Sequence, residues 1–168
     1  LTYSKQLYDE WDSSRDSTYR LYDGNSNLIY APNIDTSNVS TFDSMFYNCT
    51  NLKVVPPYNT SNLVSCARMF YGCSTLTSIP LLDFSNATTM SEVFRNCSSI
   101  TTIPEIKTTN VTNFNYLFYG ATNLETLPEI DTTNASSMTY FFGPSYMSSL
   151  TKLTKIGVKD TFGKSGKA

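Results

Sequence analysis

The chain has 168 residues, a formal net charge of −2 and 15% charged residues, without the basic surplus of nucleic-acid-binding surfaces. It has no histidine, which removes the commonest general base and the commonest metal ligand together. No apolar run approaches the roughly 20 residues of a membrane-spanning helix. We therefore expect no nucleic acid partner, no metal or other cofactor, no membrane insertion and no enzyme activity.

Residues 1–27 lack the regular spacing of the residues that follow them. Leu7 and Trp11 lie four residues apart within SKQLYDEWD, which is typical of a short helix. The segment has neither the basic start nor the apolar stretch of a signal peptide, and we expect a mature product or a fragment of a longer chain. We predict that residues 1–27 form an N-terminal helical cap, with Trp11 packed over the first unit of the repeat that follows.

From residue 28 onward the chain repeats with a period of 24 residues. Each unit has a proline, an asparagine six residues later and a phenylalanine fourteen residues after the proline. The proline column is Pro32, Pro56, Pro80, Pro104 and Pro128; the asparagine column is Asn38, Asn62, Asn86, Asn110 and Asn134; the phenylalanine column is Phe46, Phe70, Phe94, Phe118 and Phe142. Because one unit cannot bury its own apolar side chains, such units stack on one another.

Each unit is predicted to contain a short strand, a capped turn and a short helix. The strand precedes the proline, because proline has no N–H group to donate to a sheet. The polar turn, Asp-Thr-Ser-Asn at 35–38, offers side chains that cap helices. After it, apolar residues fall at helical spacing in the order Val39, Phe42, Met45, Phe46 and Cys49. Asn48 and Gly72 then stand where a left-handed residue ends a helix.

The asparagine column has two structural interpretations. Each Asn caps the helix of its own unit, or the column forms a buried ladder whose amides satisfy backbone groups of the adjacent unit.

The four cysteines lie in apolar columns of the repeat. Cys49, Cys73 and Cys97 share one column, and Cys66 lies in another. There is no Cys-x-x-Cys pair to suggest a metal site, and without histidine the usual base that activates a thiol is missing. We predict four buried, unbridged thiols that pack as small apolar side chains.

Tyrosines form two columns near the edge of the apolar stripe. The candidate binding residues are Tyr47, Tyr71, Tyr116, Tyr119 and Tyr140. Arg95 interrupts the first column, and both Tyr and Arg are favoured anchors at binding interfaces. The alternative is that the rings pack sideways on neighbouring units and shield the core.

At the C-terminal end the repeat is predicted to continue to residue 156, after an insertion that contains Gly143-Pro144. Residues 157–168 carry glycines and lysines and are predicted to form a C-terminal cap or linker. The predicted organisation is therefore a cap over 1–27, a repeat over 28–156 and a cap or linker over 157–168.

The motif of the unit resembles the BspA-like leucine-rich repeats of bacterial surface proteins, in the subgroup written DTSNV…MFYGCSSLTSIP. It is present as DTSNVSTFDSMFYNCTNLKVVP at 35–56, NTSNLVSCARMFYGCSTLTSIP at 59–80 and TTNVTNFNYLFYGATNLETLP at 108–128. The resemblance covers residues 28–156 and implies an α/β leucine-rich-repeat solenoid that serves adhesion or structural display on bacterial surfaces or phage tails and fibres. It brings no catalytic residues.

These observations predict a non-enzymatic interaction or adhesion module at a cell or virion surface, with a host or bacterial surface protein or a glycan as its partner. The alternative is a structural spacer within a phage tail or fibre or a bacterial surface protein. A third hypothesis is an enzyme that acts on glycans. It rests on a group of acidic residues, Glu105, Glu125, Glu129 and Asp131. The columns of a repeat also bring such residues together without any function. The sequence names no ligand and no oligomeric state.

Overall fold

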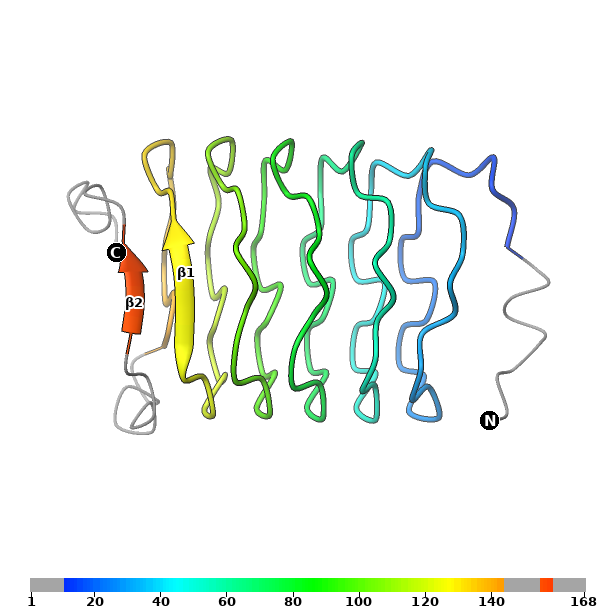
Figure 1. Cartoon of the computed structure of the whole chain (residues 1–168), viewed down its shortest axis with the longest axis horizontal. Coiled ribbons are helices and arrows are strands. Elements are labelled where there is room, and N and C mark those ends of the chain that lie inside the picture. The colour runs from blue at the N-terminus through cyan, green and yellow to red at the C-terminus, as the bar shows by residue number, and fades with distance from the viewer. Residues whose placement is uncertain (1–10, 144–154, 159–168) are drawn as a thin grey trace.

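The structure of the chain is a computed structural model, and it describes residues 11–143 and 155–158. In Figure 1 successive turns of the described chain lie side by side along one axis, from its N-terminal residues at one end to strand β2 at the other. The strands are β1 (Thr126–Ile130) and β2 (Lys155–Val158). The rest of the described chain consists of turns, bends, isolated bridges and irregular segments.

Residues one period apart in the sequence are neighbours in space. A line of parallel bridges, each spanning 24 residues, runs through Ser17, Thr41, Ser65, Thr89, Asn113 and Ser137. At this line each unit bonds to both neighbours: Ser40 N–H donates to the Asp16 carbonyl at 2.9 Å, and Phe42 N–H donates to the Ser65 carbonyl at 2.8 Å. The units are therefore joined by backbone hydrogen bonds as well as by side-chain packing.

The α/β leucine-rich-repeat solenoid predicted from the sequence is wrong. The described residues contain no helix, and a strand longer than one bridge is found only at β1 and β2. Within the segments expected to be helical, such as the stripe from Val39 to Cys49, residues 43–48, 67–72, 91–96 and 115–120 are runs of turns. Of the predicted N-terminal helical cap, residues 1–10 lie outside the described residues, and residues 11–27 form turns and bridges without a helix.

Left-handed residues interrupt every segment that was expected to be helical. Ser44 and Asn48 both have φ of 56°, and one period later Arg68 and Gly72 have φ of 59° and 72°. Two such residues four positions apart place a left-handed backbone conformation in each successive turn of the segment. A right-handed α-helix cannot continue through them.

Alternate N–H groups of these segments also leave the segment for the next unit. The N–H groups of Phe42, Ser44, Phe46 and Asn48 donate to the carbonyls of Ser65, Ala67, Met69 and Tyr71 at 2.7–2.9 Å. The N–H groups between them close tight turns: Met45, Tyr47 and Cys49 donate to the carbonyl three residues back. Since an α-helix needs each N–H to bond four residues back, helix and pairing between units exclude one another.

The sheet is parallel and has two strands. Its register is Thr126↔Lys155, Leu127↔Ile156 and Ile130↔Val158, with an irregularity before the last pair. The irregularity follows from Pro128, which has no N–H to donate. In earlier units the predicted strand is reduced to at most a single bridge two residues before the proline, as between Tyr30 and Val54, and the unit of Pro80 has no bridge there.

The apolar stripe assigned to a helix face is the core of the stack. Val39, Phe42, Met45, Phe46 and Cys49 are all fully buried. The phenylalanine column forms a continuous stack of rings, the phenylalanine spine, which runs through Tyr22, Phe46, Phe70, Phe94, Phe118 and Phe142. Successive ring centroids are 5.4–6.1 Å apart and the rings are within 3–22° of parallel. Stacking between units thus replaces the packing of helices.

The N-terminal end of the described chain already follows this arrangement. Tyr22 heads the spine, and Ser17 bridges to Thr41. Trp11 is partly buried against the core, and its indole Nε1 donates to the Asp35 carbonyl at 2.7 Å. The division of the chain into a cap over 1–27, a repeat over 28–156 and a segment over 157–168 stays a prediction.

Glycine and asparagine alternate in the column that ends each run of turns. The column is Gly24, Asn48, Gly72, Asn96 and Gly120, with φ between 56° and 80° throughout. The Oδ1 atom of Asn48 lies where a Cβ on residue 72 would be, and Asn96 occupies the same place against residue 120. An asparagine in one unit therefore requires a glycine in the next, which explains the alternation.

The asparagine column forms a ladder, as one of the two interpretations predicted, but an exposed one. Each Nδ2 donates to a carbonyl of the preceding unit at 2.7–3.1 Å; the pairs are Asn38 with Ser13, Asn62 with Ser37, Asn86 with Ser61, Asn110 with Ser85 and Asn134 with Thr109. The other interpretation, a helix cap, is wrong because no helix follows in the described chain.

The prediction of four buried, unbridged cysteines is confirmed. The thiols of one column donate to carbonyls of the preceding unit at 3.0–3.1 Å; the pairs are Cys49 with Tyr22, Cys73 with Phe46 and Cys97 with Phe70. Burial raises the pKa of the Cys49 and Cys97 thiols to about 12 and raises the pKa of the Cys66 and Cys73 thiols as well. The thiolate, the reactive form, is therefore suppressed in the folded protein.

A thiol-reactive dye at neutral pH should accordingly leave the folded protein unlabelled and titrate four thiols after denaturation without reductant. Rapid labelling before denaturation would contradict the burial of the thiols, and two or no thiols after denaturation would contradict their unbridged state.

Candidate binding face

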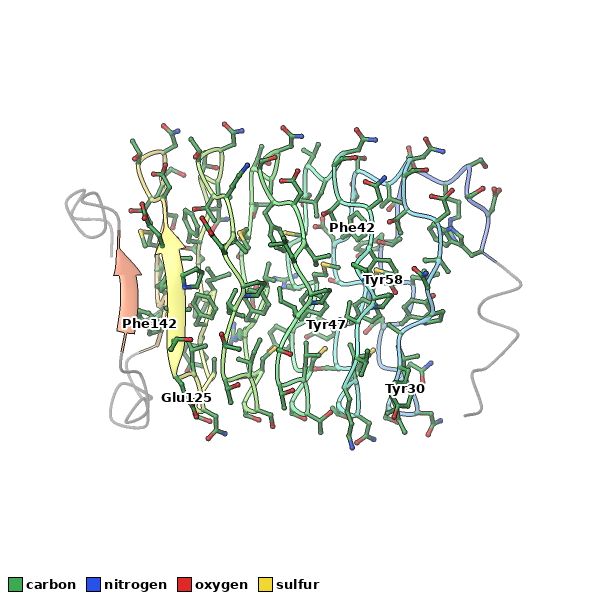
Figure 2. All side chains as sticks on the ribbon, in the orientation of Figure 1. Tyr30, Phe42, Tyr47, Tyr58, Glu125 and Phe142 are labelled. Carbon is green, nitrogen blue, oxygen red and sulfur yellow. The ribbon has the colours of Figure 1, made fainter. Side chains whose placement is uncertain are left out.

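The candidate tyrosines from the sequence lie in two adjacent rows that run from unit to unit along the stack. We call Tyr47, Tyr71, Arg95 and Tyr119, which occupy the same position in successive units, the Tyr–Arg row. Each of them directly follows a spine phenylalanine whose ring is buried, so its own side chain falls at the edge of the core and is partly exposed. Figure 2, in which Tyr47 is labelled, shows the side chains of neighbouring units at equivalent places across the stack.

Tyr47 and Tyr71 stack on each other. Their ring centroids are 4.5 Å apart and the rings are 15° from parallel. Partial burial raises the pKa of Tyr47, and its interactions with Tyr71 add to the rise. Because each ring covers a face of the other, ring edges and hydroxyl groups are the parts most available to a partner.

Arg95 continues the row in the place of a tyrosine. Its guanidinium carbon lies 5.5 Å from the centroid of the Tyr71 ring on one side and 4.9 Å from that of Tyr119 on the other. It also lies 4.7 Å from the ring centroid of Tyr116. These are cation–π distances, so a planar cation links two pairs of aromatic side chains into one continuous row.

Glu92 holds this cation in position. Its side chain is only 11% exposed, and its two carboxylate oxygens bond to different arginines at 2.8 Å: Oε1 to Arg68 and Oε2 to Arg95. The hydrogen bond from Arg68 to Glu92 raises the pKa of the Arg68 guanidinium. Two arginines against one carboxylate leave one positive charge in surplus next to the tyrosine hydroxyls.

Tyr116 and Tyr140 form the second row. Their ring centroids are 5.2 Å apart with the rings tilted by 40°, and Tyr116 also meets Tyr119 at 5.6 Å and 58°. Tyr140 is 49% exposed, the most open of the five candidate tyrosines. The Tyr119 ring lies directly over Gly143, where any Cβ would overlap it. The structure thus brings all five candidate tyrosines into two connected groups joined by Arg95.

Sequence reasoning identified the tyrosines and Arg95 but missed Arg68 and Glu92. These two residues are one period apart, and Arg95 follows Glu92 by three residues. Comparing the charges column by column would have found the ion pairs. The helix assumption hid them, because it gave Glu92 no left-handed backbone and no contact with the preceding unit.

The face is suited to binding by hydrogen bonds and one positive charge. It combines tyrosine hydroxyls, two guanidinium groups and a rigid row of stacked planes. Within residues 11–143 and 155–158, no group of three or more His, Cys, Asp or Glu side chains is placed to hold a metal ion. The same part of the chain contains no helix of the length and hydropathy needed to cross a membrane.

Comparison with known proteins places the chain in a family. Neither the curated proteins nor the solved structures gave a match. One family model matches twice, over residues 5–102 and 42–153, and the overlap of the two matches is what a repeated sequence produces. Together these matches cover most of the chain, which therefore belongs to the family described as Mycoplasma protein of unknown function, DUF285.

Proposed function

We propose that this protein is a non-enzymatic interaction module at a cell or virion surface, and that its partner, a surface protein or a glycan, lies along the Tyr–Arg row. The observation that carries the proposal is the continuity of the row across four successive units, from Tyr47 to Tyr119. A stack of units presents one extended face, so an extended partner meets equivalent side chains in each unit. The resemblance of the unit to BspA-like surface repeats supports the same proposal.

The row is preorganised for such contacts. Glu92 fixes two arginines, and each tyrosine is held by a ring or a cation next to it. Tyr and Arg offer large contact area and hydrogen bonds, and groups already held in place lose little conformational entropy on binding. Binding energy is then distributed over several units instead of depending on one pocket.

The second candidate function is a structural spacer within a phage tail or fibre or a bacterial surface protein. The stacking of Tyr47 on Tyr71 favours it, because these ring faces cover each other and shield the core beneath them. In a spacer the row contributes to stability and has no partner.

Stepwise replacement of tyrosines separates the two functions. The partner is first identified by screening the protein against glycan arrays and whole cells. Its affinity should then fall gradually as Tyr71, Tyr116, Tyr119 and Tyr140 are changed to Ser one after another, because each change removes the contact made by one position. Denaturant unfolding of every variant shows that it is still folded.

Replacements outside the tyrosine rows, in the segment before the proline, serve as controls. Lys53→Ala, Thr77→Ala and Thr101→Ala alter the segment before the proline and should leave the affinity unchanged. An affinity that depends on these three residues and ignores all four tyrosines would move the binding face away from the Tyr–Arg row. Absence of binding to every glycan and every cell in the screen would favour the spacer.

A further inference from the structure

A hollow of about 520 Å³ is lined by residues of three successive units. Its lining includes Tyr58, Asn59, Leu81, Asp83, Glu105 and Lys107. None of these positions belongs to the columns of the Tyr–Arg row. Small-molecule sites in proteins have volumes of about 300–1,000 Å³, so the hollow has room for one or two sugar rings.

The hollow is lined by residues that depart from the repeat. Tyr58 stands in a column that otherwise holds Ile34, Leu82, Ile106 and Ile130, and Lys107 stands in one that otherwise holds Asp35, Asn59, Asp83 and Asp131. Both departures line the hollow, Tyr58 as a buried side chain and Lys107 as an exposed one.

One tie between units is missing at Lys107, a residue that lines the hollow. In this column Thr108 donates to the Asp131 carbonyl at 2.9 Å and accepts from the Asp131 N–H at 2.9 Å, and Thr60 accepts from the Asp83 N–H at 2.7 Å. Phe84 replaces threonine in the unit between them and is fully buried. Having no hydroxyl, Phe84 cannot tie Lys107 in the same way.

The apolar part of the lining combines the exposed side chain of Leu81 with the buried ring of Tyr58. Leu81 is 70% exposed, the highest value among the large hydrophobic residues of the described chain. Tyr58 lies against the Phe46 ring of the spine with centroids 6.2 Å apart, and its hydroxyl donates to the Pro32 carbonyl at 2.7 Å. Because Tyr58 is only 4% exposed, Leu81 supplies the exposed apolar surface of the hollow.

The polar part is charged and available. Hydrogen bonds from Ser85 hold the pKa of Asp83 below its usual value, so its carboxylate is ionised and Oδ2 can accept a further bond. Glu105 and Lys107 are exposed on the rim. The net negative charge of two carboxylates and one ammonium repels an anionic ligand. The carboxylates accept hydrogen bonds from neighbouring hydroxyl groups of a ligand, and the ammonium donates one.

We propose that this hollow binds a neutral pyranoside, one ring face against Leu81 and its hydroxyls on Asp83, Glu105 and Lys107. The site goes beyond the proposed function, because it is separate from the Tyr–Arg row and takes a small ligand. An apolar patch beside paired hydrogen-bonding groups matches the two chemically distinct sides of a sugar ring, whose C–H face is apolar and whose rim carries hydroxyls.

Titration by heteronuclear NMR tests the proposal. The probes are the methyl glycosides of glucose, galactose, mannose and N-acetylglucosamine, with methyl glucuronide as an anionic comparison. At least one neutral glycoside should shift the amide signals of Leu81, Asp83 and Glu105, with a dissociation constant of about 1 mM. No shift at these amides with any neutral glycoside, or tighter binding of methyl glucuronide, would overturn it.

A matched pair of variants locates the contact. Glu105→Gln should weaken binding about tenfold, because it replaces a charge-assisted hydrogen bond by a neutral one. Glu129→Gln makes the same change at the equivalent exposed position one unit later and should leave the affinity unchanged. Equal effects of the two changes would contradict the site. Failure here leaves the tyrosine series unaffected, so the two proposals are tested independently.

Discussion

Replacing Phe94 by Ala is expected to lower the free energy of unfolding by about 3–5 kcal/mol, the range found when a buried Phe is truncated in a packed core. Phe94 is fully buried in the middle of the spine, with ring centroids at 5.9 Å from Phe70 and 5.4 Å from Phe118. Its removal leaves a cavity that both neighbouring units line. Chemical denaturation of the two proteins measures the difference.

Tyr47→Ala is the comparison for this change. Tyr47 directly follows the spine phenylalanine of its own unit and is partly exposed, so its loss should cost clearly less than the loss of Phe94. If the two variants lose comparable stability, the spine is not the principal source of cohesion between units.

Gly72→Ala is expected to cost about 2–4 kcal/mol, although it adds only one methyl group. Gly72 has φ of 72°, which is unfavourable for residues with a Cβ, and the added Cβ would overlap the Asn48 side chain of the preceding unit. The first effect is a backbone cost and the second a clash, and thermal or denaturant unfolding measures their sum.

Gly24→Ala separates the two effects. Gly24 has nearly the same φ, 69°, but a Cβ there would meet nothing within 4 Å. It should therefore show the backbone cost alone, about 1–2 kcal/mol. Asn48→Gly in the Gly72→Ala background removes the clashing side chain and should recover part of the loss. Equal costs at residues 24 and 72, with no recovery, would mean that the Asn48 contact is not responsible for the alternation.

The candidate site was predictable in part. The tyrosines were found because they share columns one period apart, and Arg95 was found because it interrupts one. The sandwich of Arg95 between Tyr71 and Tyr119 and its pairing with Glu92 depend on the spacing of units in space. The hollow beside Leu81 was not predicted, because it is lined by residues of three successive units and depends on how the units are placed in space.

The sequence by itself determined the period of 24 residues, the burial of the apolar columns and the unbridged state of the cysteines. These follow from composition at repeated positions, because apolar side chains are buried in whatever backbone carries them. The left-handed backbone of Asn48 and Gly72 was also expected, although as the end of a helix.

Only the tertiary structure decided between helix and turns. The tight turns point side chains inward at nearly the same spacing as an α-helix does. The pattern from Val39 to Cys49 is therefore compatible with a helix and with a run of turns. The other left-handed position, four residues earlier in each unit, falls on Ser44, Arg68 and Glu92. Their residue types give no indication of a left-handed backbone. The choice was made by the neighbouring unit, which takes every second N–H group and leaves too few for a helix.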